Sequence, residues 1–342
     1  MRAVELVHGA GGPEMIELIE KVIVSRVPPS LRSSLGGVGL EALDDGSYMR
    51  IGGSYVVVTS DSYTVKPPFF PGGNIGSLAA SGVINDLVVM GARPVAFLDN
   101  IVVEEGFPLG ELEEVVGSMV DVLRREGVAL IGGDFKVMPR GSVDGIVISG
   151  TGIGISDVEP IVDAPRPGDA LVVTGPVAEH GAVILAAQLG MLEEAKGLAS
   201  DARPLTNLLP VLRKYRAHVS AARDPTRGGL AAVLNEWARG SNVTLVVDRR
   251  SIPVREEVAQ FLDALGVDPL NVASEGVAVI SVSSEVAEEF VGELRKAGEP
   301  AATVIGRVEE GSGPLRGRVV ALTEVGGRTL VVPNPLNLPR IC

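Results

Sequence analysis

The sequence of 342 residues contains one cysteine, Cys342, and three histidines. A single cysteine excludes an internal disulfide and a zinc site built from several cysteines. The histidines His8, His180 and His218 also lack the spacing of a metal site. No uncharged apolar run reaches the roughly 18 residues of a membrane span, and the first residues contain no signal-like segment. We therefore expect a cytoplasmic protein with no membrane partner.

Basic residues are outnumbered, with 30 Lys and Arg against 43 Asp and Glu, and the formal net charge is −13. No cluster of Lys and Arg offsets this acidity locally, so the sequence lacks the basic surface that binds a phosphate backbone. We do not expect nucleic acid as a partner. Hydrophobic residues make up 46% of the chain, which is enough to bury a sizeable core.

The chain alternates strand-like and helix-like runs, and its 43 glycines and 23 prolines separate them. This pattern predicts a two-domain mixed α/β fold, with residues 1–155 and 170–330 as domains, 156–169 as linker and 331–342 as a mobile, extended tail. Predicted strands cover residues 55–61, 94–103, 128–133, 143–153, 170–174, 243–248, 276–282, 302–308 and 318–323. Predicted helices cover residues 13–27, 74–91, 109–126, 178–190, 205–217, 226–239, 254–265 and 284–297.

The common nucleotide motifs are absent, since neither a P-loop nor a well-formed G-x-G-x-x-G occurs. The segment from His8 to Pro13 reads His-Gly-Ala-Gly-Gly-Pro and leads into a predicted helix. Pro13 suits the first position of that helix, and the glycines would let the backbone approach an anion at the helix N-terminus. A plain N-terminal loop explains this segment equally well.

Acidic residues stand beside or inside apolar runs at four places, which are Asp45, Asp61, Asp86 and Asp134. Burying a carboxylate is costly unless it is paired or binds a cation, and several carboxylates together suit Mg²⁺ with substrate phosphates. Each aspartate alone is more simply explained as a helix cap or a turn residue. Four of them in one half of the chain favour a magnesium site.

Two further features lie in the second half of the chain. Asp224 precedes Pro-Thr-Arg-Gly-Gly, which predicts a helix N-cap followed by proline at the first helical position, while Arg227 and the glycines allow an anion site. Cys342 follows a proline-rich segment where packing would not require a thiol, so it is either an inert tail residue or a reactive group. The predicted tail leaves this thiol exposed.

Together these residues resemble the HypE family of hydrogenase maturation proteins, within the superfamily of aminoimidazole ribonucleotide synthetase and selenophosphate synthetase. The matching motifs span the whole chain, and they are His8-Gly-Ala-Gly-Gly12, Ser60-Asp-Ser-Tyr63, Pro68-Phe-Phe-Pro-Gly-Gly-Asn-Ile-Gly76, Asn85-Asp-Leu87, Gly133-Asp-Phe-Lys-Val137, Asp224-Pro-Thr-Arg-Gly-Gly229, Ser274-Glu-Gly276 and Pro339-Arg-Ile-Cys342. The final Pro-Arg-Ile-Cys distinguishes this family within the superfamily. Phe135 and Ser77 depart from the pattern, because threonine and lysine are usual there.

The resemblance implies an N-terminal domain that binds ATP and Mg²⁺ and builds a barrel with a second subunit in a homodimer, and a C-terminal α/β domain that closes over ATP. It also implies the reaction. A partner carbamoyltransferase places a carbamoyl group on Cys342, and ATP-dependent dehydration converts it to a thiocyanate. The cyano group then becomes the cyanide ligand of the iron in the [NiFe]-hydrogenase centre, through a scaffold complex of two further maturation proteins.

The same resemblance implies site residues. Cys342 carries the reacting group, and Lys136 and Glu275 are candidates for activating the carboxamide and taking its proton, although Glu275 and Lys136 could equally form a salt bridge. Mg²⁺ would be held by Asp45, Asp61, Asp86 and Asp134. Nucleotide binding would use His8, Gly11, Asp61, Gly73, Asn74, Asn85, Asp86, Asp134, Asp224 and Arg227.

Two other functional classes fit the sequence. One is a relative in the superfamily, such as a selenophosphate synthetase, a thiamine-phosphate kinase or an aminoimidazole ribonucleotide synthetase, which would act on a free small molecule and would not need Cys342. The other is a nucleotide-binding scaffold without catalytic activity. ATP hydrolysis that depends on carbamoylated Cys342 would separate these classes.

Overall fold

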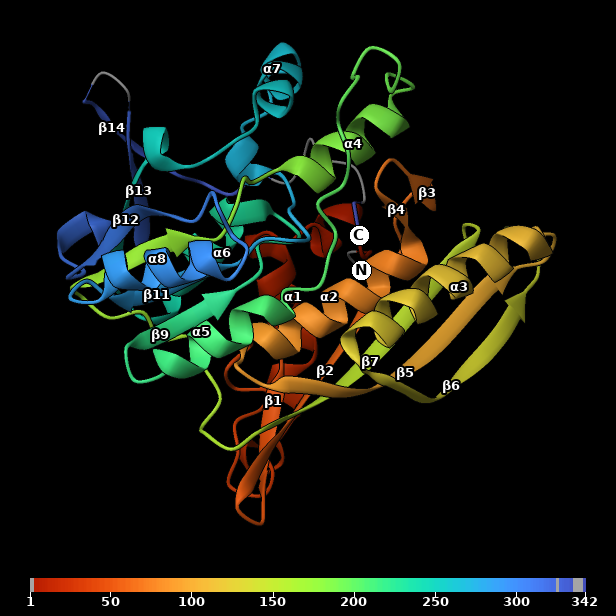
Figure 1. Cartoon of the computed structure of the whole chain (residues 1–342), viewed down its shortest axis with the longest axis horizontal. Helices are drawn as coiled ribbons and strands as arrows, with labels where there is room; N and C mark the ends of the chain where they lie inside the picture. The colour runs from red at the N-terminus through yellow and green to blue at the C-terminus, as the bar shows by residue number, and fades with distance from the viewer. Residues whose placement is uncertain (1–2, 324–325, 335–340) are drawn as a thin grey trace.

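The computed structural model describes residues 3–323, 326–334 and 341–342. Its first half contains a five-stranded sheet (Figure 1), with the strand order β1 (Ser47–Ile51), β2 (Ser54–Tyr63), β7 (Ile146–Ser156), β5 (Arg93–Glu104) and β6 (Ala129–Met138). Strands β5 and β6 are parallel and are connected through helix α3 (Leu109–Glu126), whereas the other neighbours are antiparallel. A two-stranded hairpin, β3 (Phe69–Phe70) and β4 (Gly73–Asn74), precedes helix α2 (Ile75–Val89).

The second half contains a seven-stranded sheet, in the order β14 (Arg328–Leu330), β13 (Arg318–Leu322), β10 (Thr244–Asp248), β12 (Thr303–Glu309), β8 (Asp169–Val173), β11 (Val279–Ser283) and β9 (Val219–Arg223). Only β10 and β13 pair in parallel among these described strands. The accompanying helices are α4 (Glu179–Gln188), α5 (Leu209–Lys214), α6 (Gly229–Gly240), α7 (Glu256–Ala264) and α8 (Ala287–Lys296). The predicted two-part α/β fold is confirmed.

Helix α2 is the central element of the molecule. Every residue of this helix except Ser77 is buried, and a helix that is apolar on all sides has to be covered on all sides. Glycines in β7 let it lie close to the first sheet, because a Cβ at Gly152 would come within 2.6 Å of the Val83 side chain. On its other side α2 contacts β9 of the second half.

The largest apolar core spans the two halves, and each half also has a cluster of its own. A single cluster of buried side chains includes Val83 and Phe97 from the first half and Val172, Ile280 and Phe290 from the second. The segment 157–168 connects the two sheets. The division into domains at residues 1–155 and 170–330 stays a prediction. Among the described helices, none combines the length and the apolar character needed to cross a membrane.

Most predicted elements agree with the structure to within a few residues, but the short strands β1, β3, β4, β9 and β14 were missed. These strands have two to five residues and lack a clear alternation of apolar and polar side chains. Two predicted strand ends were wrong, because β2 continues past Asp61 to Tyr63 and β6 continues past Asp134 to Met138. Both aspartates therefore lie within strands.

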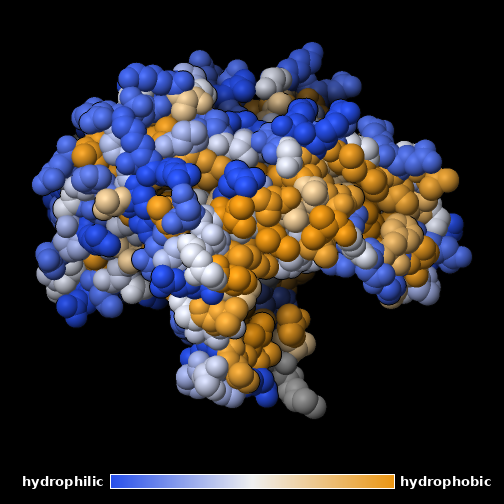
Figure 2. All heavy atoms as spheres, turned by 60° about the horizontal axis from the view of Figure 1, so that its bottom comes forward, coloured by the Kyte–Doolittle hydropathy of each residue, from blue (hydrophilic) through white to orange (hydrophobic). Residues whose placement is uncertain are grey.

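One face of the molecule is unusually apolar. Figure 2 shows a band of hydrophobic residues across the side on which the first sheet lies, and the exposed apolar side chains of that sheet include Ile51, Leu130, Ile131, Phe135 and Val137. Every residue of the edge strand β6 is exposed. Neither sheet closes into a barrel within the described residues, so the barrel with a second subunit stays a prediction.

Candidate functional site

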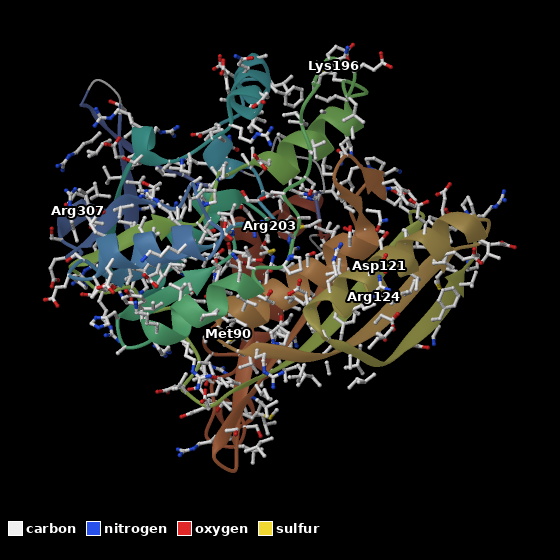
Figure 3. All side chains as sticks on the ribbon, in the orientation of Figure 1. Met90, Asp121, Arg124, Lys196, Arg203 and Arg307 are labelled. Carbon is white, nitrogen blue, oxygen red and sulfur yellow. The ribbon has the colours of Figure 1, made fainter. Side chains whose placement is uncertain are left out.

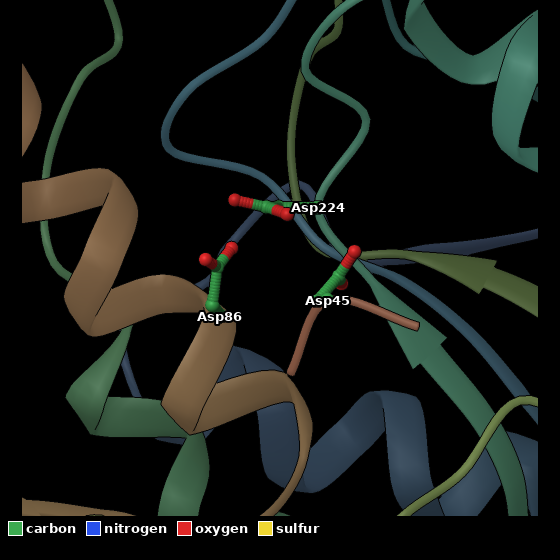
Figure 4. A group of neighbouring side chains, drawn as sticks. All are labelled: Asp45, Asp86 and Asp224. Carbon is green, nitrogen blue, oxygen red and sulfur yellow. The ribbon is translucent and has the colours of Figure 1, made fainter. Parts of the chain in front are cut away.

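Three aspartates from separate parts of the chain meet at one point (Figure 4). Asp45 lies in the loop before β1, Asp86 on α2, and Asp224 directly after β9. One carboxylate oxygen from each lies within 4.8 Å of the others. Asp86 accepts a hydrogen bond of 2.6 Å from Thr59 Oγ1, whereas an Oδ2 atom of Asp45 and of Asp224 has no hydrogen-bond partner among the described residues. Buried oxygens without a donor are the arrangement expected of ligands to a cation.

The electrostatics of this cluster also favour a cation. Burial raises the pKa of Asp45 and of Asp86 well above the usual range, and the neighbouring carboxylates raise both further. Burial, with repulsion from Asp61, raises the pKa of Asp224 to about 7. Without a counterion the cluster therefore retains protons at neutral pH. A hard divalent cation would remove this penalty, so the residues fit Mg²⁺.

Arg223 lies next to the aspartate cluster and pairs with the carboxylates around it. Its guanidinium lies 3.2 Å from Asp45 Oδ1 and 2.9 Å from Asp163 Oδ2, and it also contacts Asp44 and Glu236. Burial lowers the pKa of Arg223, but the surrounding carboxylates outweigh this and raise it, so the group stays charged. This one buried cation thereby ties the loop of Asp45 to the second half.

Cys342 lies in a small cavity beside the three aspartates. The other lining residues are Asp61, Ser62, Tyr63, Gly82, Asp86, Asp224, Thr226, Arg227 and Glu275. The remaining space is about 10 Å³, close to the least that holds one water molecule. Burial, with repulsion from Glu275, raises the pKa of the Cys342 thiol to about 12. The expectation of an exposed thiol was wrong, because Ile341 is buried and draws the following residue into the protein.

A second, larger cavity adjoins the first. Its volume is about 380 Å³, within the range of small-molecule sites. It reaches the loop of Asp44 and Asp45, and it shares with the Cys342 cavity the residues Asp61, Asp86, Asp224, Thr226 and Arg227. The site thus has an inner compartment that holds the thiol and an outer compartment that could hold a larger polar ligand, with carboxylates in the wall between them.

Glu275 stands on the inner wall without a partner. Its side chain is 1% exposed, and neither carboxylate oxygen has a hydrogen-bond partner among the described residues. Burial, followed by repulsion from Asp224 and Asp201, raises the pKa of Glu275 well above the usual range. Its backbone is fixed, since Asp201 accepts from the Glu275 N–H and Asn85 Nδ2 donates to the Glu275 carbonyl. A fixed, unpaired carboxyl of raised pKa has the properties of a general base.

Two predicted residues lie away from this site. Asp134 and Lys136 are on the exposed strand β6 and pair with each other at 2.5 Å, so the salt bridge considered between Lys136 and Glu275 does not form. The register aligns Asp134 with Asn100, then Ser149, then Ser62. Three strand spacings of roughly 4.8 Å place Asp134 about 14 Å along the sheet from β2. Neither residue lines either cavity.

The glycine-rich segment near the N-terminus approaches the second half. Pro13 begins helix α1 (Pro13–Val22), as predicted. A Cβ on Gly11, whose φ is +79°, would come within 2.7 Å of the Arg227 carbonyl oxygen, so only glycine permits this contact. The loop therefore packs against Arg227 at the rim of the outer cavity. His8 lies in the preceding 3-10 helix, where its Nδ1 accepts from the Glu5 N–H.

Asn74 and Asn85 are engaged in the fold itself. Asn74, next to Gly73 in β4, caps α2, because its Oδ1 accepts from the Gly76 and Ser77 N–H groups, and the Ser77 hydroxyl completes the capping box. Asn85 donates to the carbonyls of Arg203 and Glu275 and accepts from the Leu205 N–H. Figure 3 places Arg203 near the middle of the molecule, between the two halves. A nucleotide contact for either asparagine stays a prediction.

The prediction of Asp224 as a helix N-cap was wrong. Helix α6 begins at Gly229, and its N-cap is Gly228, whose φ of +76° lies in the left-handed region. Gly229 also has a positive φ, so the chain turns twice before it becomes helical. This double turn frees Asp224 from capping and leaves its carboxylate in the acidic cluster.

Two family models match the chain. The N-terminal domain of AIR synthase related proteins matches residues 43–156, and the C-terminal domain matches residues 166–315. The carbamoyl dehydratase HypE of Rhizobium leguminosarum is 38% identical over 343 residues, which cover 99% of this chain and 95% of that protein. The carbamoyl dehydratase HypE of Escherichia coli is 37% identical over 349 residues, covering 100% of both. The chain belongs to the HypE family.

Solved structures agree with this assignment. HypE in complex with ATP superposes with a TM-score of 0.79 at 36% identity, covering 99% of this chain and 100% of that one. HypE in a HypE–HypF complex superposes with a TM-score of 0.83 at 31% identity, covering 94% and 100%. The resemblance derived from the sequence motifs is therefore confirmed.

Sequence reasoning missed Arg223, Asp201 and His180 among the residues that shape this HypE site. Arg223 directly precedes the Asp224 motif, so its position next to an aspartate was the one available signal. Asp201 and His180 stand outside every motif, and their partners lie far away in the sequence.

The acidic cluster predicts a pH-dependent response to Mg²⁺. Because the folded pKa of Asp224 is about 7, above that of an unfolded carboxyl, this group stabilises the metal-free protein at low pH and loses that contribution as the pH rises through 7. Mg²⁺ must displace the proton at about pH 5.5 but not at about pH 8. Thermal unfolding should therefore show a larger stabilisation by Mg²⁺ at the higher pH.

The matched variants are Asp224→Asn and Asp121→Asn. Asp121 lies on α3, where it pairs with Arg124 at 2.8 Å (Figure 3), and its variant should respond to Mg²⁺ like the wild type. Asp224→Asn should be more stable than the wild type at about pH 8 without metal, since it removes a buried charge, and should lose most of the response. An unchanged response in Asp224→Asn would contradict the assignment of this cluster.

Proposed function

We propose that the chain is an ATP-dependent carbamoyl dehydratase that converts a carbamoylated Cys342 to a thiocyanate, the source of the cyanide ligand in [NiFe]-hydrogenase maturation. The observation that carries this proposal is the position of Cys342, enclosed by unpaired carboxyl groups beside a larger cavity. The relatives named carbamoyl dehydratase and the HypE structure with ATP support it.

The inner cavity suits a neutral carboxamide better than a thiolate. With a pKa of about 12, the docked thiol stays protonated and is a poor nucleophile. Carbamoylation is therefore expected outside this cavity, on a partner enzyme. A solved HypE–HypF complex supports HypF as that partner, and the family resemblance implies that it is the carbamoyltransferase. The scaffold complex of two further maturation proteins is part of the proposal on the same resemblance.

The dehydration needs an activated oxygen and a base. The carboxamide oxygen attacks the terminal phosphorus of ATP, ADP leaves, and one N–H proton is lost, which gives an O-phosphorylated imidate on sulfur. The carbon–oxygen bond then breaks, phosphate leaves with the oxygen, and the second N–H proton is lost as the nitrile forms. Glu275 is the base for a proton on nitrogen, since it faces the cavity and makes no competing hydrogen bond among the described residues.

The polyphosphate belongs in the outer cavity. Asp45, Asp86 and Asp224 would hold Mg²⁺, with Asp61 on the shared wall, and the ion would compensate the charge of the phosphates. Arg227 lines both cavities and supplies a positive charge there. Its pKa is raised, above all by interaction with Cys342.

A homodimer through the first sheet would complete the site. Asp134 and Lys136 lie on the exposed strand β6, too far along the sheet to reach the cavities of their own chain. A two-fold partner that covers the apolar face in Figure 2 would protect this edge strand. It would also bring a second set of these two side chains toward the site.

The proposed reaction changes the mass of the protein in two steps. Wild-type protein incubated with carbamoyltransferase, carbamoyl phosphate and ATP should show, by intact-mass spectrometry, a carbamoyl adduct that converts to a product lighter by one water. Cys342→Ala should form neither species. Glu275→Gln should form the adduct but convert it about a hundredfold more slowly, because a general base contributes roughly 10²–10⁴-fold.

Glu288→Gln is the matched control for that assay, since Glu288 is exposed on α8 and should leave the rate unchanged. Conversion at the wild-type rate in Glu275→Gln would remove Glu275 from the chemistry. A dehydrated product on Cys342→Ala would contradict the proposed function itself.

The exposed apolar face of the first sheet predicts a dimer in solution. Light scattering should give a dimer at micromolar concentration for the wild type. Ile131→Asp with Val137→Asp should give a monomer, since these side chains are 58% and 59% exposed on β6. Leu189→Asp, at an exposed position after α4, should remain dimeric. A monomeric wild type would contradict the dimer.

A further inference from the structure

The end of the chain docks beside the start of α4. Figure 1 shows it near α4 and the β3–β4 hairpin. The Ile341 side chain is 6% exposed and joins the main core cluster, and the main-chain oxygen of Cys342 accepts a 2.9 Å hydrogen bond from Thr64 Oγ1. The carbonyl oxygen of Ile341 lies 3.1 Å from Nε2 of His180. The main chain is thus held on both sides of the Cys342 Cα, by His180 at the Ile341 carbonyl and by Thr64 at the Cys342 main-chain oxygen.

His180 is completely buried, and its neighbours define the position of its ring hydrogen. The Ile341 carbonyl can only accept, so Nε2 of His180 carries a hydrogen and donates it to this oxygen. Burial lowers the pKa of His180 to about 4, which keeps the ring neutral and leaves Nδ1 without a hydrogen. Nδ1 therefore accepts from the Ser200 hydroxyl at 2.7 Å, and Ser200 Oγ in turn accepts from the Ala202 N–H.

The ring is also held sterically. Phe70, in the β3–β4 hairpin, meets it edge to face at 5.4 Å between ring centroids. The His180 backbone N–H donates to Asp201, the same carboxylate that accepts from the Glu275 N–H. A Cβ at the next residue, Gly181, would come within 2.5 Å of the Val272 side chain and 3.2 Å of Ile341 Cδ1, so a glycine permits the close packing here. The ring is therefore fixed in one position, with Nε2 directed at the end of the chain.

We propose that His180 is a positioning residue for the reaction, which fixes the Ile341–Cys342 peptide so that the group carried by Cys342 faces Glu275. If the end of the chain undocks, a buried N–H loses its acceptor, and such a loss is costly. The hydrogen bond therefore favours the docked state over the undocked one. This inference rests on the proposed function for its catalytic meaning, but the docking itself can be measured without any turnover.

The single cysteine makes that measurement direct. Cys342 is only partly exposed, and the cavity of about 10 Å³ beside it is too small for a bulky thiol reagent, so a faster reaction with Cys342 reports a larger undocked fraction. His180→Leu has a side chain of similar size without the N–H donor, and its labelling rate should rise about tenfold. His180→Gln can still donate from its amide and should be labelled at close to the wild-type rate.

His218→Leu is the matched control. His218 is exposed, so this substitution should not change the labelling rate of Cys342.

Ser200→Ala provides a second test if His180→Leu fails to fold. It removes the hydroxyl that fixes the ring and should raise the labelling rate by a smaller factor of about threefold. In the mass assay, His180→Leu should slow dehydration of the carbamoylated protein while leaving ATP binding unchanged.

Two outcomes separate this inference from the proposed function. Equal labelling rates in folded His180→Leu, Ser200→Ala and wild type would overturn the role of His180. Faster labelling of His180→Leu, together with no dehydration by the wild-type protein, would support the docking role and contradict the proposed function instead.

Discussion

The structure depends on the burial of several carboxyl groups around one thiol. Asp86, Asp224 and Glu275 are all buried within one site, and burial raises the pKa of each. Such an arrangement is stable only if the surrounding protein cannot relax, because the carboxyls would otherwise separate or take up water. The fully buried helix α2 and the buried cation of Arg223 supply this rigidity. The repulsion between the carboxylates is also what makes the cluster a strong site for a cation.

The same arrangement explains why Cys342 has to be modified outside this cavity. A cavity this small and this acidic holds a neutral group but disfavours a thiolate, so the step that modifies Cys342 and the step that dehydrates it need different surroundings. Docking then depends on a few specific contacts, from Ile341, Thr64 and His180. Residues 335–340 of the predicted mobile tail lie outside the described residues, so its mobility stays a prediction.

The fold and part of the site could be predicted from the sequence. The all-round apolar run of α2 with Asp86 inside it was a strong signal, because a carboxylate in such a helix requires a partner. The family motifs located Glu275 and Cys342. The pairing of Asp224 with Asp45 was beyond reach, since tertiary contacts bring them together, and the positive φ values after Asp224 removed its expected capping role. His180 was missed because an isolated histidine shows its function only through distant partners.

In the proposed reaction, the carboxamide oxygen on Cys342 leaves as part of phosphate. The most direct measurement uses a carbamoyl group labelled with ¹⁸O, followed by mass spectrometry of the phosphate released during a single turnover. We expect the label to appear in the phosphate, because the oxygen is phosphorylated before the carbon–oxygen bond breaks. Label in the solvent water, with unlabelled phosphate, would show that ATP hydrolysis and dehydration are separate reactions and would exclude an O-phosphorylated intermediate.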